Sequence, residues 1–228
     1  VGRADANAER ILRSCGEPQL TNRLKFISRL QPLLAGDASM ARLGVEASLE
    51  RSFAELGRRQ VAAALLSGIE QVGLGGGGAW QRLQDYKATG EVTAVGVSLA
   101  HASEAEALLD IPGLDYLEIP FNVLSAPLPD AVETLAARGV VVLAHSIYAG
   151  GSLLSGAHPR TQALAKAADA VRRQGIADLA VSYVLGHRAI SSIALGTVTD
   201  DQMRHNLDLA AMEPLSDNEI QRVRELLD

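Results

Sequence analysis

Four polar side chains lie at or just beyond the ends of runs that favour β-strands, and their types suit acid–base chemistry. They are Arg29, Glu118, His145 and Tyr148. An arginine can hold an anion, while a carboxylate and an imidazole can donate or accept protons. A structural interpretation is equally open, because Arg29 and Glu118 can simply pair with each other.

Six short β-rich runs, each followed by a helical pattern, are the elements that must position these side chains. They lie at about Leu24–Leu30, Val61–Leu66, Val92–Val97, Tyr116–Ile119, Val140–Ala144 and Ser191–Leu195. This alternation predicts an α/β fold with a parallel sheet. Residues 140–144 are apolar without alternation, which is typical of a sheet buried on both faces, as in a barrel covered by helices.

Two local sequence patterns add to this prediction of secondary structure. Ser216 and Glu219 predict a capping box at the start of the last helix. Gly73, Gly75 and Gly78 formally match the dinucleotide-binding pattern G-x-G-x-x-G. However, these glycines do not directly follow the preceding strand, and no acidic residue ends a strand about 20 positions later to hold a ribose. The glycine run is therefore interpreted as a mobile strand-to-helix loop.

Composition narrows the function classes. The 228 residues are 47% hydrophobic, which predicts a single domain over residues 1–228. The net charge of −6, with acidic and basic residues interspersed, argues against nucleic-acid binding. No apolar run approaches the roughly 20 residues that span a bilayer, and Cys15 has no partner for an internal disulfide. We therefore expect a cytoplasmic protein without a membrane partner.

The scattered His101, His158 and His187 are interpreted as surface residues, without metal-ligand spacing.

Five segments, in their order and spacing, resemble the aldo/keto reductase family. They are residues 48–57, 80–98, 116–122, 145–156 and 194–206. The resemblance implies a TIM-barrel-derived fold of the aldo/keto reductase type, lacking the first two strands. It also implies that the carboxyl ends of the strands hold NADP(H) and a small carbonyl or alcohol substrate. With two strand–helix units absent, exposed barrel edges are expected, and the N-terminal helix or a second copy of the chain could cover them.

The family reduces carbonyls with a tyrosine as general acid, assisted by lysine, aspartate and histidine. The resemblance places Val1 at the tyrosine position, Arg29 at the lysine position and Ser67 at the histidine position. The strand that carries the aspartate would precede the chain. Because a guanidinium stays charged and cannot shuttle protons, lost or altered catalysis is expected.

The cofactor positions of the family are better preserved. By resemblance, the residues expected to contact the cofactor are Ser98, Glu118, His145, Ser146, Gly196, Thr197, Gln202 and Asn206. Glu118 replaces a glutamine, Leu99 an asparagine and His205 an acidic residue. The helix after Thr197 is expected to present its N-terminal N–H groups to an anion.

Two hypotheses follow. The first is an NADP(H)-dependent carbonyl or alcohol oxidoreductase, or a relic of one that keeps the fold and the phosphate site. The second is a non-redox lyase or isomerase, or a binding protein, that uses Arg29, Glu118, His145 and Tyr148 at the mouth of the barrel.

Overall fold

The structure is a computed structural model that describes residues 9–10, 13–14, 24–197 and 199–228. Val1 and Cys15 lie outside the described residues. The chain divides into two compact units: unit 1 comprises residues 1–100 and 104–118, and unit 2 comprises residues 101–103 and 119–228. The described residues contain six strands, whose order in the sheet follows the chain from β1 to β6.

The sheet of unit 1 is parallel and buried. Its strands are β1 (Ile27–Arg29), β2 (Val61–Ser67), β3 (Val92–Ser98) and β4 (Tyr116–Pro120). β1 pairs with β2, β2 with β3, and β3 with β4, all in parallel. Four consecutive residues of β2, Ala63–Leu66, are buried, as the unbroken apolar run predicts for a strand covered on both faces.

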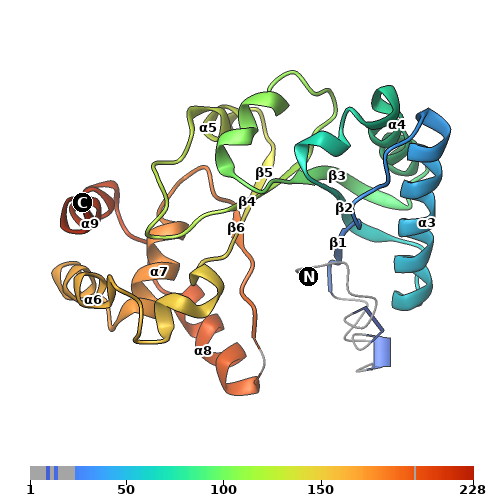
Figure 1. Cartoon of the computed structure of the whole chain (residues 1–228). Helices are drawn as coiled ribbons and strands as arrows, with labels where there is room; N and C mark the ends of the chain where they lie inside the picture. Colours follow the sequence, from blue (N-terminus) through green and yellow to red (C-terminus); the bar gives the residue numbers. More distant parts are fainter. Residues whose placement is uncertain (1–8, 11–12, 15–23, 198) are drawn as a thin grey trace. The chain divides into compact units, whose positions relative to one another are not determined.

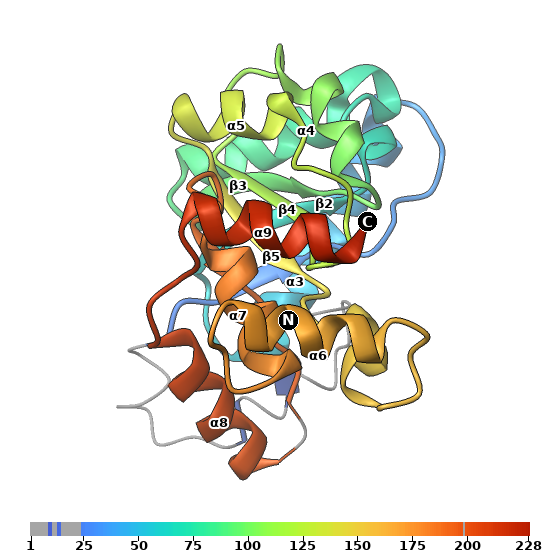
Figure 2. The same cartoon turned by 90° about the vertical axis from the view of Figure 1, so that its left-hand side faces the viewer.

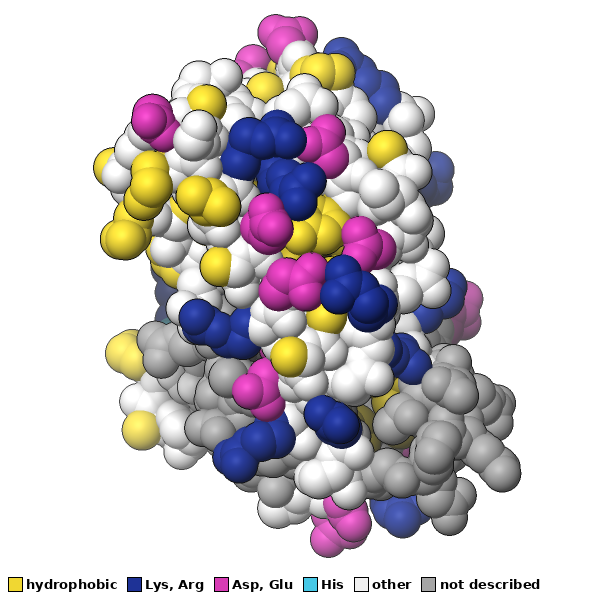
Figure 3. Space-filling model, turned by 90° about the vertical axis from the view of Figure 1, so that its right-hand side faces the viewer, with side chains coloured by type: hydrophobic (Ala, Val, Ile, Leu, Met, Phe, Trp, Pro, Cys, Tyr) yellow, Lys and Arg dark blue, Asp and Glu magenta, His cyan; other side chains and the backbone are white. Residues whose placement is uncertain are grey.

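Two helices of unit 1, α3 (Ala38–Leu56) and α4 (Leu74–Ala88), lie side by side (Figure 1). α3 buries one face at helical spacing, which includes Leu49, Phe53 and Leu56. Acidic and basic side chains are interspersed over the surface of these helices (Figure 3). Short 3-10 helices follow β2 and β3: η1 (Ile69–Gln71) and η2 (Ala102–Leu108).

The glycine run forms the start of α4 and lies against the start of α3. Gly75, Gly76 and Gly77 have positive φ values of 61°, 62° and 86°. A Cβ atom on Gly75 would lie 2.7 Å from the carbonyl oxygen of Asp37, and one on Gly78 would lie 2.9 Å from that of Ala38. The run is therefore a left-handed turn that lets two helix ends approach closely, which explains the glycines without a phosphate.

Unit 2 has a short parallel pair of strands, β5 (Val141–His145) and β6 (Ser192–Ile193). Its helices are α5 (Asp130–Ala137), η3 (Ala149–Leu154), α6 (Thr161–Ala170), α7 (Ile176–Leu185), α8 (Asp200–Ala210) and α9 (Asp217–Leu227). α6 packs against both α7 and α9 (Figure 2). The predicted capping box of Ser216 and Glu219 is present at the start of α9.

An aromatic cluster fills part of unit 2, and it corrects one sequence-based interpretation. The rings of Phe121 and Tyr183 stack at 6.2 Å, and the imidazole of His187 lies 4.9 Å from each of them. His187 is half-buried, so it is not a surface residue as we expected from its place at a helix end. A position after a helix does not reveal which side chains another segment places over it.

Neither a membrane-spanning helix nor a metal-binding cluster occurs among the described residues. No described helix combines the length and the apolar character that crossing a bilayer requires. The described residues also contain no group of three or more His, Cys, Asp or Glu side chains placed to hold a metal ion.

Candidate functional site

Ser67 and Ser98, at the carboxyl ends of β2 and β3, form one row with Glu118 of β4. The strand register places Ser67 beside Ser98, and Ser98 beside Glu118. Parallel strands end at the same edge of a sheet, so the alternating side chains of these three residues share a face. Ser98 and Glu118 are both buried.

Arg29, at the end of β1, reaches this row and pairs with Glu118. Its Nε lies 3.0 Å from Oε2 of Glu118, and its Nη2 lies 2.5 Å from Oε1. The side chain of Glu118 is 7% exposed and that of Arg29 is 21% exposed. This two-pronged, charge-assisted geometry is the strongest form of an arginine–carboxylate contact. The geometry therefore matches the structural interpretation of the two residues, in which each neutralises the other.

The hydroxyl group of Ser67 is also hydrogen-bonded within the protein. It donates to the carbonyl oxygen of Leu30, which ties the end of β2 to the residue after β1.

A pocket of about 540 Å³ opens beside these strand ends. It is lined by Arg29, Leu30, Gln31, Pro32, Ser67, Gly68, Glu70, Ser98, Leu99, Ala100 and Glu104. Glu70 and Glu104 were not among the predicted site residues, because sequence patterns do not show which loop side chains line a pocket.

In unit 2, β5 ends at His145 and a strained turn follows. Nδ1 of His145 lies 2.7 Å from the hydroxyl oxygen of Ser146. Ser146 has a left-handed backbone, with φ of 59°, and its carbonyl oxygen accepts a hydrogen bond of 3.3 Å from the side-chain amide of Asn122. A left-handed non-glycine residue costs about 1 kcal/mol or more, and such residues concentrate at functional sites.

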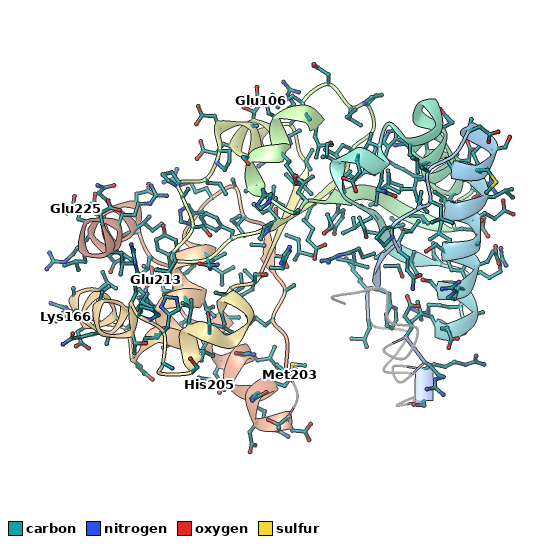
Figure 4. All side chains as sticks on the ribbon, in the orientation of Figure 1. Glu106, Lys166, Met203, His205, Glu213 and Glu225 are labelled. Carbon is teal, nitrogen blue, oxygen red and sulfur yellow. The ribbon has the colours of Figure 1, made fainter. Side chains whose placement is uncertain are left out.

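A second pocket, of about 560 Å³, lies within unit 2 and gathers many of the predicted cofactor residues. Its lining includes Ser146, Tyr148, Gly196, Gln202 and Asn206. His205 also lines it, from α8, where Figure 4 labels its side chain. Thr197 and His145 are not part of the lining. The structure therefore brings together four of the eight predicted cofactor residues, Ser146, Gly196, Gln202 and Asn206, and it adds Tyr148.

Tyr148 and Asn206 are bonded to each other in this pocket. The hydroxyl of Tyr148 donates to Oδ1 of Asn206 across 2.9 Å, which links the turn after β5 to α8. Asn206 is buried, and burial raises the pKa of the Tyr148 hydroxyl above its usual value. The sequence contains no sign of this pair, because its members are separated by 58 positions.

The N-terminus of α8 differs from the anion site that we expected after Thr197. The side-chain hydroxyl oxygen of Thr199 caps the helix by accepting from the backbone N–H of Gln202 at 3.2 Å. Asp200 and Asp201 occupy the first turn. Carboxylates in a first turn compensate the positive end of the helix dipole, so they compete with a bound anion.

Comparison with known proteins identifies the relatives of this chain. The model of the aldo/keto reductase family matches residues 36–228. The chain belongs to the aldo/keto reductase family. The match begins after Arg29, so the assignment of that residue to the family's lysine position still depends on resemblance in the sequence alone. No curated protein sequence matches the chain.

Solved structures of similar fold come from the same family. The aldo-keto reductase AKR11C1 from Bacillus halodurans is similar in its apo form, with a TM-score of 0.75, and in its holo form, with a TM-score of 0.77. Each comparison has 16% sequence identity and covers 96% of this chain and 76% of the other chain. At this identity the likeness concerns the fold alone, and it confirms the predicted α/β fold of the aldo/keto reductase type.

Proposed function

We propose that this aldo/keto reductase binds NADP(H), and that the pocket of unit 2 holds the adenosine end of the cofactor. The observation that supports the proposal most strongly is that Ser146, Gly196, Gln202 and Asn206, distant in sequence, line one pocket of about 560 Å³. The family uses the positions of these four residues for the cofactor.

The residues present suit an adenosine group. Gln202 and Asn206 carry amides that can donate and accept hydrogen bonds, as the edge of a purine requires. Leu154 and Leu195 add apolar surface to the same lining. Mostly apolar walls with a few polar groups are typical of small-molecule sites.

The first turn of α8 suits an additional phosphate less well. Asp200 and Asp201 place two carboxylates there, and the described residues that line the pocket include no lysine or arginine to pair with a phosphate. We therefore expect the adenosine contacts to contribute most of the affinity. The preference for NADPH over NADH should be modest, within about tenfold, which corresponds to about 1.4 kcal/mol.

We also propose that carbonyl reduction is lost or altered. A bound nicotinamide would supply a hydride, but the reaction also needs a proton donor near the developing alkoxide. Arg29 is held by Glu118, and the hydroxyl proton of Ser67 is committed to the carbonyl oxygen of Leu30. Neither residue is free to take the role that the family gives to its position.

A calorimetric titration tests the binding proposal. NADPH, NADH and adenosine 2′,5′-bisphosphate would each be titrated into the wild type, Gln202→Glu and Gln162→Glu. Gln202→Glu adds a negative charge to the pocket lining with almost no change of shape, and should weaken NADPH roughly fivefold or more. Gln162→Glu makes the same change on the exposed surface of α6 and should bind like the wild type. Failure of all three ligands to bind the wild type at millimolar concentration would exclude the proposal.

A further inference from the structure

A separate pocket of unit 2, of about 620 Å³, shares no residue with the proposed nucleotide site. Its walls come from α5 and the segment before it, from the segment after α7 and from α9, the helix that crosses the viewer-facing side of Figure 2. Leu128, Ala136 and Ile220 give it apolar surface, while His187, Gln221 and Arg224 give it polar groups. This combination is typical of a site for a small organic molecule.

Arg224 is the distinctive residue of this pocket. Its Nε donates to the hydroxyl oxygen of Tyr183 at 3.1 Å, and its Nη2 lies 3.4 Å from Nε2 of His187. No carboxylate of the described residues lies within ion-pairing distance of this guanidinium, which is half-buried. A positive charge that is partly withdrawn from water and bonded only to neutral groups favours an anionic ligand.

The protonation state of His187 follows from its hydrogen bonds. Its Nδ1 lies 2.9 Å from the carbonyl oxygen of Tyr183, which can only accept, so Nδ1 carries the proton. Nε2 is then a free acceptor for Arg224. Burial lowers the pKa of His187, and the positive charge of Arg224 lowers it further. His187 is therefore a neutral partner and leaves the charge of Arg224 uncompensated.

The other charged residues of the lining limit the kind of anion. Arg188 and Asp217 form an exposed pair with each other at 3.5 Å. Glu133 is an exposed residue of α5 that also lines the pocket. A nearby carboxylate disfavours a dianion such as a phosphate ester more than a monoanion. A carboxylate also matches the paired N–H groups of a guanidinium.

We propose that this pocket binds a small organic monocarboxylate, with its carboxylate on Arg224 and its apolar body against Leu128, Ala136 and Ile220. The ligand class follows from one uncompensated guanidinium, apolar walls and one repelling carboxylate. The two pockets share no lining residue, so benzoate and NADPH should bind without competing.

Ligand-observed NMR with benzoate as the probe tests the proposal on the whole chain. Benzyl alcohol, which has nearly the same shape without the charge, and phenyl phosphate serve as comparison ligands. Benzoate should bind at least tenfold more tightly than benzyl alcohol, because only its carboxylate makes charge-assisted hydrogen bonds to the guanidinium. It should also bind more tightly than phenyl phosphate. Equal binding of benzoate and benzyl alcohol would overturn the proposal.

Matched variants then test whether benzoate binds in this pocket. Arg224→Gln should weaken benzoate about tenfold or more, while Arg222→Gln, which removes the same charge from an exposed position of α9, should have no effect. Equal affinity of these two variants would refute the assignment to this pocket. The imidazole proton signals of His187 in the wild type give a check that needs no Arg224 variant. They should shift on addition of benzoate, and unchanged signals would also refute the proposal.

Discussion

Arg29 and Glu118 join the first and fourth strands of unit 1 through two hydrogen bonds, of 3.0 Å and 2.5 Å, across 89 positions of sequence. Strands β2 and β3 lie between them in the order of the sheet. A pair of this kind contributes little net stability relative to apolar residues, but it is costly to break, because the remaining charge stays buried.

The first prediction concerns this cost. Arg29→Met should lower the free energy of unfolding by about 2–3 kcal/mol, below the roughly 3–5 kcal/mol of a fully buried pair, because Arg29 is 21% exposed. The double variant Arg29→Met, Glu118→Leu should recover much of the loss. Urea denaturation measures both values, with the exposed Arg222→Met as control. A double variant as unstable as the sum of its single changes would contradict a direct pairing.

The second prediction concerns carbonyl reduction. Without a positioned general acid, worth about 10²–10⁴-fold, NADPH oxidation in the presence of aldehydes should stay near the uncatalysed rate. The assay follows the loss of NADPH absorbance over a panel of aliphatic and aromatic aldehydes. Turnover of roughly 1 s⁻¹ or faster, in the ordinary range for enzymes, would show that another residue provides the proton.

The third prediction concerns Tyr148. Because burial raises its pKa, the hydroxyl should ionise above the usual pH of about 10. Subtracting the alkaline absorbance titration of Tyr148→Phe from that of the wild type isolates this transition. The unfolded chain ionises first, so the stability that Tyr148 contributes is complete below pH 10 and declines as the pH rises through the folded-state value. A difference transition at or below pH 10 would contradict the burial of this hydroxyl.

The positions of the central strands could be predicted from their continuous apolar runs. β2 and β3 were each predicted to within one residue, since both are central, continuous and apolar. β1 and β6 are shorter than predicted, at Ile27–Arg29 and Ser192–Ile193. The length of a strand is set by the hydrogen bonds that its neighbour offers, and residue patterns do not record those bonds.

The candidate site was only partly predictable. Arg29 and Glu118 stood out as possible partners because of their charges and their place at strand ends. The bond between Tyr148 and Asn206, and that between Arg224 and His187, depend on which helices pack together. Sequence patterns place residues along one element but do not fix contacts between distant elements.

The fourth prediction concerns the pH dependence that His187 confers. Burial and the charge of Arg224 lower its pKa, whereas hydrogen bonds to the backbone of Tyr183 and Val184 and the charge of Glu133 oppose this shift. The stability linked to neutral His187 is therefore present above about pH 6.5 and is lost as the pH falls from there towards the folded-state value. His187→Gln, whose amide can replace both hydrogen bonds, should flatten the decline in stability as the pH falls below about 6.5.

Arg224→Gln serves as a matched comparison, because it removes the charge and leaves the burial of His187. It should reduce the slope without abolishing it, since burial is the larger cause. Urea denaturation at half-unit pH intervals measures all three slopes. Identical slopes for the wild type and His187→Gln would show that His187 is not kept neutral in the fold.

The last prediction separates two reasons for the glycine run. Gly75 and Gly76 have nearly the same left-handed φ, 61° and 62°, but only Gly75 is crowded. A Cβ atom there would lie 2.7 Å from the carbonyl oxygen of Asp37 and 2.8 Å from Cβ of Ala41, while one on Gly76 would meet nothing within 4 Å. Gly76→Ala should therefore cost only the backbone strain, about 1–2 kcal/mol. Gly75→Ala should cost about 1–3 kcal/mol more, because α3 and α4 must move apart. Thermal and urea unfolding of the two variants measure this difference, and equal losses would mean that the run serves turn geometry alone.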